Sequence, residues 1–252
     1  LYNKLQTPIT SEEREVTIRF PQVDPAGIVF YPRYFEMVLK CFPDVPIGRA
    51  PVGVKTQFLK PNRLGDRLTL HYESGSDSWK VTGRMDDRDH FSMTSLDGDE
   101  SPGADADPAD STSFQTNPEI VGEWMSDRSG HMTTSRYFEA VNMAIEEWFE
   151  ESLDMPFHEL HVGRRVGIPT VQFVTRIDSL PATGEAYSIR IRPTKLGGRS
   201  MSFTSRLVCG DTCLVKNEQV VVFVRMKRDG YESIEIPGFV RDAFASRLQE
   251  GT

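Results

Sequence analysis

The sequence predicts an α+β protein made of two similar modules, each with one helix and several antiparallel strands. Three observations support this class. The order strand, loop, helix and strands occurs twice, two pairs of segments repeat at fixed offsets, and an acidic stretch separates the copies. The chain has 252 residues, which allows one large domain or two modules of roughly 120 residues. The repeat selects two modules.

Two pairs of segments define the repeat. Residues 23–38 align with residues 126–141 at an offset of 103, and both contain an aspartate, a glycine and the run Arg-Tyr-Phe-Glu. Residues 50–66 align with residues 169–185 at an offset of 119. The second copy is therefore sixteen residues longer between the two matches. The pattern indicates a tandem duplication whose copies have diverged.

A stretch between the copies has the composition of a linker. Residues 97–113 contain no apolar side chain other than alanine. Such a segment cannot bury enough surface to offset its ordering entropy, so we expect a flexible tether, with an acidic interaction tail as the alternative. We therefore divide the chain into a first module at 1–96, a linker at 97–117 and a second module at 118–252.

In the first module the elements follow in order. Val16, Ile18 and Phe20 alternate with polar residues and predict a strand. A glycine-containing loop leads to a helix with Pro32 in its first turn, and Pro43 ends it after about ten residues. Three further strand candidates follow at 68–72, 79–85 and 91–96.

The second module has a longer helix and longer strands. Five apolar residues recur at helical spacing: Tyr137, Val141, Ala144, Ile145 and Trp148. Thr134 or Ser135 can cap this helix. Strands are predicted around residues 187–191 and 201–203, and the apolar run 220–224 predicts a strand buried on both faces. A helix followed by a meander of strands predicts an antiparallel sheet packed on the helix.

Charge and hydropathy exclude some classes of protein. The net charge of −8 argues against nucleic-acid binding. No apolar run approaches the roughly 20 residues that span a bilayer, and the first residues lack a secretory signal pattern. We therefore expect a cytoplasmic protein without nucleic-acid or membrane partners. Six acidic residues lie within 97–113, so the rest of the chain is near −2, which does not exclude a ligand that carries phosphate.

The sequence predicts no metal and no cofactor. Cys209 and Cys213 flank a turn-like stretch, where a disulfide or half of a metal site is an alternative to reduced thiols. Reduced thiols are the simpler interpretation for a cytoplasmic protein. His158 and His161 are one residue short of the spacing that would place both on one helical face, so we reject a metal there.

The run DPAGIVFYPRYFEMV at residues 24–38 resembles the signature of the 4-hydroxybenzoyl-CoA thioesterase group of hotdog-fold proteins. The order of elements agrees with that fold, in which a curved sheet wraps a central helix. Members of the group pair as dimers with acyl-CoA sites at the interface. The resemblance therefore implies a tandem hotdog whose two modules pair within one chain, with further homo-oligomer formation left open.

The Asp loop carries the predicted chemistry. Asp24 can act as a general base on water or as a direct nucleophile, and free backbone N–H groups at the helix start near Tyr31 can stabilise an oxyanion. Gly27 lets the loop backbone approach a ligand. The resemblance implies that Asp24 is catalytic and that the Tyr31 N–H polarises the thioester carbonyl. The alternative is an aspartate that only hydrogen-bonds its own turn.

The second copy departs from the signature. Asp127 is retained and is a candidate second site, but Arg128 beside it predicts a salt-bridged surface loop. His131 can be a base, although a lone histidine in a polar loop is more often a bystander. We therefore expect one competent Asp loop, completed by the second module.

Basic residues are needed near a CoA tail. The resemblance implies substrate binding by the turn that contains Lys195, Gly198, Arg199 and Ser200, for which a plain hairpin with solvated charges is the alternative. Lys60, Asn62 and Arg63 occupy the corresponding inter-strand region of the first copy and are weaker candidates.

The sequence is compatible with three functions to different degrees. The first is an acyl-CoA thioesterase that releases a free acid and CoA, and the second is a non-catalytic module that binds acyl-CoA as a sensor or scaffold. A hotdog hydratase is the third, but its Asp and His pair is not found. The intact Asp24 motif favours hydrolysis. The acyl group, and CoA against acyl carrier protein as the carrier, stay open.

Overall fold

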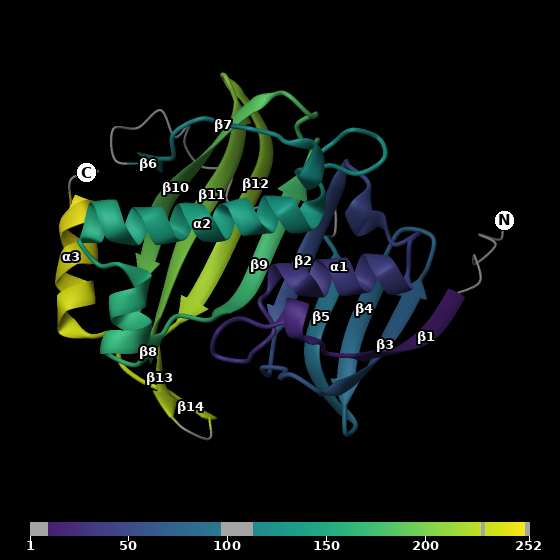
Figure 1. Cartoon of the computed structure of the whole chain (residues 1–252), viewed down its shortest axis with the longest axis horizontal. Helices are drawn as coiled ribbons and strands as arrows, with labels where there is room; N and C mark the ends of the chain where they lie inside the picture. The colour runs from purple at the N-terminus through teal and green to yellow at the C-terminus, as the bar shows by residue number, and fades with distance from the viewer. Residues whose placement is uncertain (1–9, 97–112, 228–229, 250–252) are drawn as a thin grey trace, which may run out of the picture.

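The computed structural model describes residues 10–96, 113–227 and 230–249. Its main feature is an eleven-stranded antiparallel sheet in the order β1-β3-β4-β5-β2-β9-β12-β11-β10-β6, with β7 pairing to β10. Two helices, α1 and α2, lie across the same face of this sheet (Figure 1). The α+β class is therefore as predicted.

Each half of the chain supplies one side of the sheet. The first half contains β1 (Thr10–Thr17), α1 (Pro32–Cys41), β2 (Val52–Phe58), β3 (Arg67–Ser74), β4 (Trp79–Met85) and β5 (Arg88–Ser95). The second half begins with β6 (Phe114–Gln115), β7 (Glu119–Ile120), α2 (Thr134–Leu153), β8 (Val166–Gly167) and β9 (Thr170–Ile177). It continues with β10 (Ala186–Leu196), β11 (Ser200–Cys209), β12 (Thr212–Val222), β13 (Val224–Lys227), β14 (Gly230–Ser233) and α3 (Gly238–Gln249).

The two main helices differ in length for the predicted reason. Helix α1 has ten residues with Pro32 in its first turn, and Pro43 follows two residues after its end. Helix α2 has twenty residues. Its cap is Thr133, whose side chain accepts the N–H of Arg136 at 3.4 Å, so the prediction of Thr134 or Ser135 was wrong by one or two positions.

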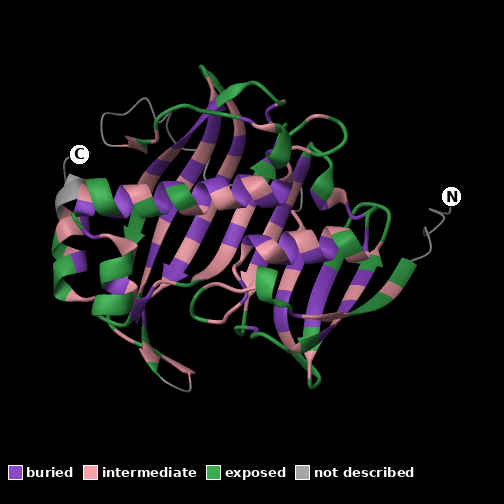
Figure 2. Ribbon diagram, viewed as in Figure 1, coloured by how far each residue is buried: buried purple, intermediate pink, exposed green. Residues whose placement is uncertain are grey.

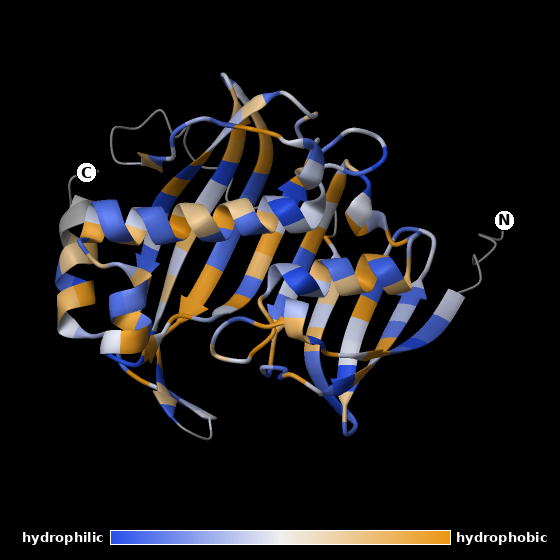
Figure 3. Ribbon diagram, viewed as in Figure 1, coloured by the Kyte–Doolittle hydropathy of each residue, from blue (hydrophilic) through white to orange (hydrophobic). Residues whose placement is uncertain are grey.

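The core lies between the helices and the sheet. Buried residues alternate along the central strands and line the inner faces of both helices, and the hydropathy of these strands alternates in the same way (Figures 2 and 3). Phe35 of α1 and Phe138 of α2 are both fully buried and stack with ring centroids 4.1 Å apart. They occupy equivalent positions of the repeat at offset 103.

The two halves of the sheet join at β2 and β9 with matched register. Lys55 pairs with Val174, which is its own equivalent at offset 119. The flanking pairs are reciprocal: Val54 pairs with Thr175, the equivalent of Thr56, and Thr56 pairs with Phe173, the equivalent of Val54. This is the pairing of an isologous two-fold interface, made here within one chain.

Two of the predicted strands differ from the structure. Strand β1 ends at Thr17, and Phe20 lies 78% exposed in a short 3-10 turn. The run 220–224 is not one doubly buried strand. It is divided between β12 and β13, and Val220 and Val222 are only partly buried because one face of β12 is open.

The C-terminal region contains elements that the sequence did not predict. Strands β14, β13 and β8 form a separate three-stranded sheet, and α3 packs on α2 through Phe244 and Trp148 with centroids 5.9 Å apart. The second half therefore ends in a helix and not in the meander of strands that the sequence predicts for it.

The structure describes only part of the predicted linker, and it also bears on the two neighbouring cysteines and on membrane-spanning helices. Residues 97–112 of the predicted linker lie outside the described residues, and β6 at Phe114–Gln115 already pairs with β10. Cys209 lies opposite Thr212 and Cys213 opposite Val208, so the two thiols do not face each other. In the part of the chain that is described, no helix is both long and apolar enough to cross a membrane.

Candidate functional site

The loop around Asp24 is a closed turn held by its own backbone. The N–H of Asp24 donates to Ile28 O at 2.8 Å, and the N–H of Gly27 donates back to Asp24 O at 2.9 Å. The N–H of Val29 then donates to Asn62 O at 2.9 Å, which fixes the loop to the segment between β2 and β3. These bonds position Asp24 seven residues before Tyr31, the N-cap residue of α1.

The same loop occurs in the second half, bond for bond. At offset 103 the N–H of Asp127 donates to His131 O, Gly130 N–H to Asp127 O, and Met132 N–H to Pro181 O. Pro181 is the equivalent of Asn62 at offset 119. The left-handed glycines also correspond, with φ values of 77° and 78° at Gly27 and Gly130. Both offsets read from the sequence thus describe equivalent backbone structure.

The Asp24 carboxyl group is partly buried and half engaged. Its Oδ1 accepts the N–H groups of Ala26 at 2.8 Å and Ile28 at 3.1 Å. Its Oδ2 accepts no hydrogen bond from the described residues. Burial raises the pKa of Asp24 above its usual value, although the two backbone bonds and the positive field of His161 oppose this rise. One carboxylate oxygen is therefore positioned by the loop while the other is available for chemistry.

Tyr31 supplies the free donor at the start of α1. It is the N-cap residue, and the next residue, Pro32, has no N–H. The N–H groups of Arg33 and Tyr34 donate to Phe30 O and Tyr31 O within the turn. Among the described residues the Tyr31 N–H finds no acceptor, so the predicted cluster of N–H groups reduces to this one.

The side chain of Tyr31 has the packing role that we expected. Its hydroxyl donates to Phe138 O of α2 at 3.1 Å, and its ring lies 5.0 Å from the ring of Phe173 in β9. The N-terminus of α1 is thereby fixed against the second half of the chain.

Residues from the second half approach Asp24. His161 lies in the turn Glu159–Gly163 after α2, and Tyr231 lies in β14; both are near enough to interact electrostatically with the Asp24 carboxylate. The guanidinium of Arg63 sits 5.8 Å from the centroid of the Tyr231 ring. Sequence reasoning missed His161 and Tyr231, because no local signal shows which distant turn packs beside a loop.

Gly27 allows a simple test of the loop geometry. A Cβ at this position would meet no atom within 4 Å, so replacing Gly27 with Ala would cost only the left-handed conformation at φ 77°. We expect a loss of about 1–2 kcal/mol of unfolding free energy. Chemical denaturation measures it, with Gly198→Ala as control, since Gly198 has equal space without the left-handed φ. Equal losses in the two variants would contradict the assignment of strain to Gly27.

The Asp127 loop has a different environment. Asp127 is exposed, and its Oδ1 accepts both the N–H and the hydroxyl of Ser129, at 2.8 Å and 2.6 Å. Burial raises the pKa of Asp127, but these bonds more than offset it and the pKa lies below its usual value. Among the described residues Arg128 forms no ion pair with Asp127, so the predicted salt bridge is replaced by the Ser129 contacts.

The predicted substrate-binding turn is a closed hairpin end. The N–H of Gly197 donates to Ser200 O at 2.8 Å, and Gly198 O accepts the N–H of Ile236 at 2.9 Å. Arg241 of α3 donates to the carbonyl oxygens of both glycines. Lys195 and Arg199 are exposed, and no hydrogen bond or ion pair within the described chain joins this turn to Asp24.

The weaker candidates of the first half separate in space. Lys60 and Arg63 are exposed, whereas Asn62 is fully buried between Tyr34 and His90. The Tyr34 hydroxyl donates to Asn62 Oδ1 at 2.9 Å, and Asn62 Nδ2 lies 2.9 Å from His90 Nδ1. Asn62 therefore belongs to a buried polar network rather than to a solvent-exposed binding surface.

Comparison with known proteins shows what the chain is similar to. Residues 121–244 match the family model of the thioesterase-like superfamily. The chain is similar over most of its length to the structure of a putative oleoyl thioesterase from Lactobacillus plantarum, with a TM-score of 0.63, 10% identity, and 86% of this chain and 96% of that chain covered. The chain is also similar to the structure of the 12:0-ACP thioesterase from Umbellularia californica, with a TM-score of 0.63 and 9% identity. The match covers 84% of this chain and 94% of that chain. Among curated proteins, none matches the sequence.

These similarities show the fold of the chain. It is an α+β hotdog fold, in which one large antiparallel sheet packs around two central helices. The family match lies in the second half, while the motif that carries the predicted catalytic aspartate lies in the first.

Proposed function

We propose that this chain hydrolyses an acyl- or aryl-CoA thioester to a free acid and CoA, as a tandem hotdog enzyme of the 4-hydroxybenzoyl-CoA thioesterase type. The observation that carries the proposal is the arrangement of Asp24 and α1. A partly buried carboxylate with one free oxygen sits on the loop that leads to a helix N-terminus with a free N–H at Tyr31. Those two groups are the ones that thioester hydrolysis requires.

The chemistry follows from their roles. As general base, Asp24 takes a proton from water while the water oxygen bonds to the thioester carbon and the carbonyl electrons move to oxygen. The Tyr31 N–H and the helix dipole stabilise that oxyanion. Its collapse breaks the carbon–sulfur bond, and the departing thiolate takes the proton from Asp24. As nucleophile, the Asp24 carboxylate instead attacks the thioester carbon, and the carbon–sulfur bond breaks as CoA leaves as a thiolate that takes a proton from solvent. Water then hydrolyses the acyl-aspartyl anhydride to the free acid and the regenerated carboxylate.

The proposal includes the division into modules at 1–96 and 118–252 and their pairing within one chain. The two-fold register of β2 and β9 and the stacking of Phe35 on Phe138 support it. Such pairing brings His161 and Tyr231 of the second module to the Asp loop of the first. Lys195 and Arg199 are exposed and can meet CoA phosphates, with Gly198 in the turn between them and Ser200 directly after it at the start of β11.

The test is release of free thiol from a panel of aryl- and fatty-acyl-CoA thioesters. We expect turnover of at least one member. A parallel panel of acyl carrier protein thioesters identifies the carrier. If no thioester of either panel is hydrolysed, the enzymatic proposal fails.

A non-catalytic acyl-CoA-binding module is the second candidate, because Asp24 Oδ1 is already used by its own turn. Calorimetric binding of acyl-CoA by wild-type protein that shows no turnover would select it. Asp127 is proposed as a second site only in a minor role, since its carboxylate is exposed and its Oδ1 is held by the N–H and the hydroxyl of Ser129.

His161 gives a prediction about pH dependence. A carboxylate base is active only when ionised, so the rate should fall as the pH drops through the raised pKa of Asp24. The charged form of His161 lowers that pKa. Replacing His161 with Gln should therefore raise it and move the acid limb of kcat/KM to higher pH. His158→Gln is the matched control, because His158 is an exposed histidine of the same region and, unlike His161, is not one of the groups that shift the pKa of Asp24. An acid limb that stays fixed in His161→Gln would exclude this coupling.

A further inference from the structure

A cavity of about 380 Å³ lies at one end of the first half of the chain. It is lined by Lys60, from the segment after β2, and by Met85, Asp86, Arg88 and His90, from the hairpin of β4 and β5. Its size falls within the range of roughly 300–1,000 Å³ typical of ligand sites. None of the functions proposed above uses it.

His90 forms the back of this cavity and is only 5% exposed. Burial raises the pKa of Tyr34, so its hydroxyl stays protonated and donates to Asn62 Oδ1. The Asn62 amide must then direct its NH₂ group at His90 Nδ1, which accepts. The proton of the neutral imidazole is thereby placed on Nε2, for which the described residues provide no partner.

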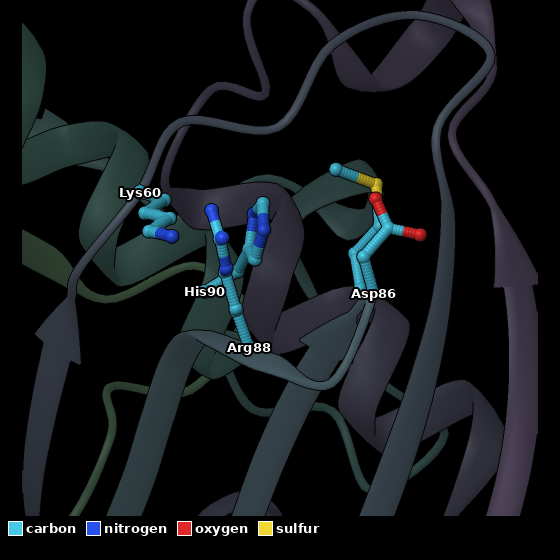
Figure 4. A pocket seen from close by; sticks show the side chains of 5 residues that line it. Lys60, Asp86, Arg88 and His90 are labelled. Atoms are coloured by element: carbon cyan, nitrogen blue, oxygen red, sulfur yellow. The ribbon is translucent and has the colours of Figure 1, made fainter.

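Two cations stand beside this N–H. Lys60, Arg88 and His90 lie together on one side of the cavity, and Asp86 lies across from them (Figure 4). Neither Lys60 nor Arg88 has an ion-pair partner among the described residues, whereas the nearby Arg84 is bound to Asp89 at 2.8 Å. Burial lowers the pKa of His90, so it contributes a neutral donor rather than a third charge.

We propose that this cavity binds a phosphate group, held by Lys60, Arg88 and the Nε2–H of His90. A guanidinium, an ammonium and an N–H that face one hollow supply the several donors that a phosphate accepts, and the two cations match its dianionic charge. Asp86 on the opposite wall favours a ligand whose remainder carries hydrogen-bond donors.

The phosphate can belong to an independent ligand or to the 3′-phosphate of CoA. The second source rests on the proposed function. The cavity is linked to the Asp24 loop by hydrogen bonds of Asn62. The Asn62 side chain orients His90, and the Asn62 carbonyl oxygen accepts the N–H of Val29. Both sources present the same chemistry to the cavity.

The first experiment titrates the full-length protein with inorganic phosphate by calorimetry. We expect saturable binding that weakens about tenfold or more in Lys60→Gln and in Arg88→Gln, since a hydrogen bond to a charged group contributes about 1.5–3 kcal/mol. Lys80→Gln is the matched control, because Lys80 is an exposed cation of β4 that does not line the cavity. All three sites are exposed, and thermal unfolding confirms that the variants fold.

Absence of saturable binding in the wild type, or equal binding by Lys60→Gln, Arg88→Gln and Lys80→Gln, would overturn the proposal. Phosphate binding is measured without turnover, so a negative thioesterase assay does not contradict the phosphate site. Titration with CoA and dephospho-CoA then distinguishes the sources. If Lys60→Gln weakens CoA but not dephospho-CoA, the cavity takes the 3′-phosphate. If it weakens inorganic phosphate alone, the ligand is a separate phosphate compound.

Discussion

Replacing Asp24 with Asn should remove thioester hydrolysis and at the same time make the protein more stable at neutral pH. Loss of a general base lowers the rate by about 10²–10⁴. Asparagine keeps the shape of the side chain, and its Oδ1 can still accept the N–H groups of Ala26 and Ile28. The variant therefore removes the charge and the proton acceptor while the loop is retained.

The expected gain in stability follows from the direction of the pKa shift. Burial raises the pKa of Asp24 in the folded protein above its unfolded value, so folding favours the protonated form. The resulting contribution to stability is present at low pH and is lost as the pH rises through the folded pKa. At neutral pH the wild type therefore holds a disfavoured charge that Asn lacks. Thermal unfolding at neutral and acidic pH should show a difference that shrinks as the pH falls.

The equivalent residue of the second half is a control with the opposite sign. The pKa of Asp127 is lowered, because its contacts with Ser129 and His131 together outweigh its burial, so its ionised form stabilises the fold above its unfolded pKa. Asp127→Asn should reduce stability at neutral pH and leave most of the activity. If Asp24→Asn hydrolyses thioesters at the wild-type rate, Asp24 is not the base. If Asp24→Asn is less stable than the wild type, the desolvation argument is wrong.

Local signals predicted much of the fold. Pro32 and Pro43 bound α1 as expected, since proline suits the first turn of a helix and cannot continue one. The offsets of 103 and 119 identified equivalent loops down to single hydrogen bonds, because loops with a left-handed glycine need that residue at that place. Helix α3 was missed, although Val240 and Phe244 have helical spacing and follow Pro237, because two buried residues make a weak periodic pattern.

The sequence predicted only those residues of the candidate site that lie close together along the chain. Asp24, Gly27 and Tyr31 lie within eight consecutive residues, so one motif contains them all. His161 and Tyr231 reach the same place from a turn and a short strand of the other half, and nothing in their own surroundings marks them. The cavity at His90 likewise depends on the packing of Tyr34 and Asn62, which are 28 positions apart.

Phe138 makes the central contact between the two halves of the chain, so its replacement should strongly destabilise the fold. Phe138 of α2 is fully buried, stacks on Phe35, and lies 4.8 Å from the ring of Phe173. Replacing Phe138 with Ala should lower the free energy of unfolding by about 3–5 kcal/mol, because the cavity left between the helices cannot close. Met143→Ala on the same helix is the control. Its side chain is 53% exposed, so the loss should stay within about 0.5 kcal/mol.

If the two halves fold as one unit, the loss of unfolding free energy in Phe138→Ala should be seen equally from both halves. Trp79 in β4 and Trp148 in α2 are both buried and report on different halves. In proteins that retain only one of these tryptophans, Phe138→Ala should shift the urea midpoint of fluorescence equally, because the continuous pairing of β2 and β9 couples the two sides of the sheet. A shift confined to the Trp148 signal would show instead that the second half unfolds independently, and the pairing of β2 and β9 would then be too weak to hold Asp24 beside His161.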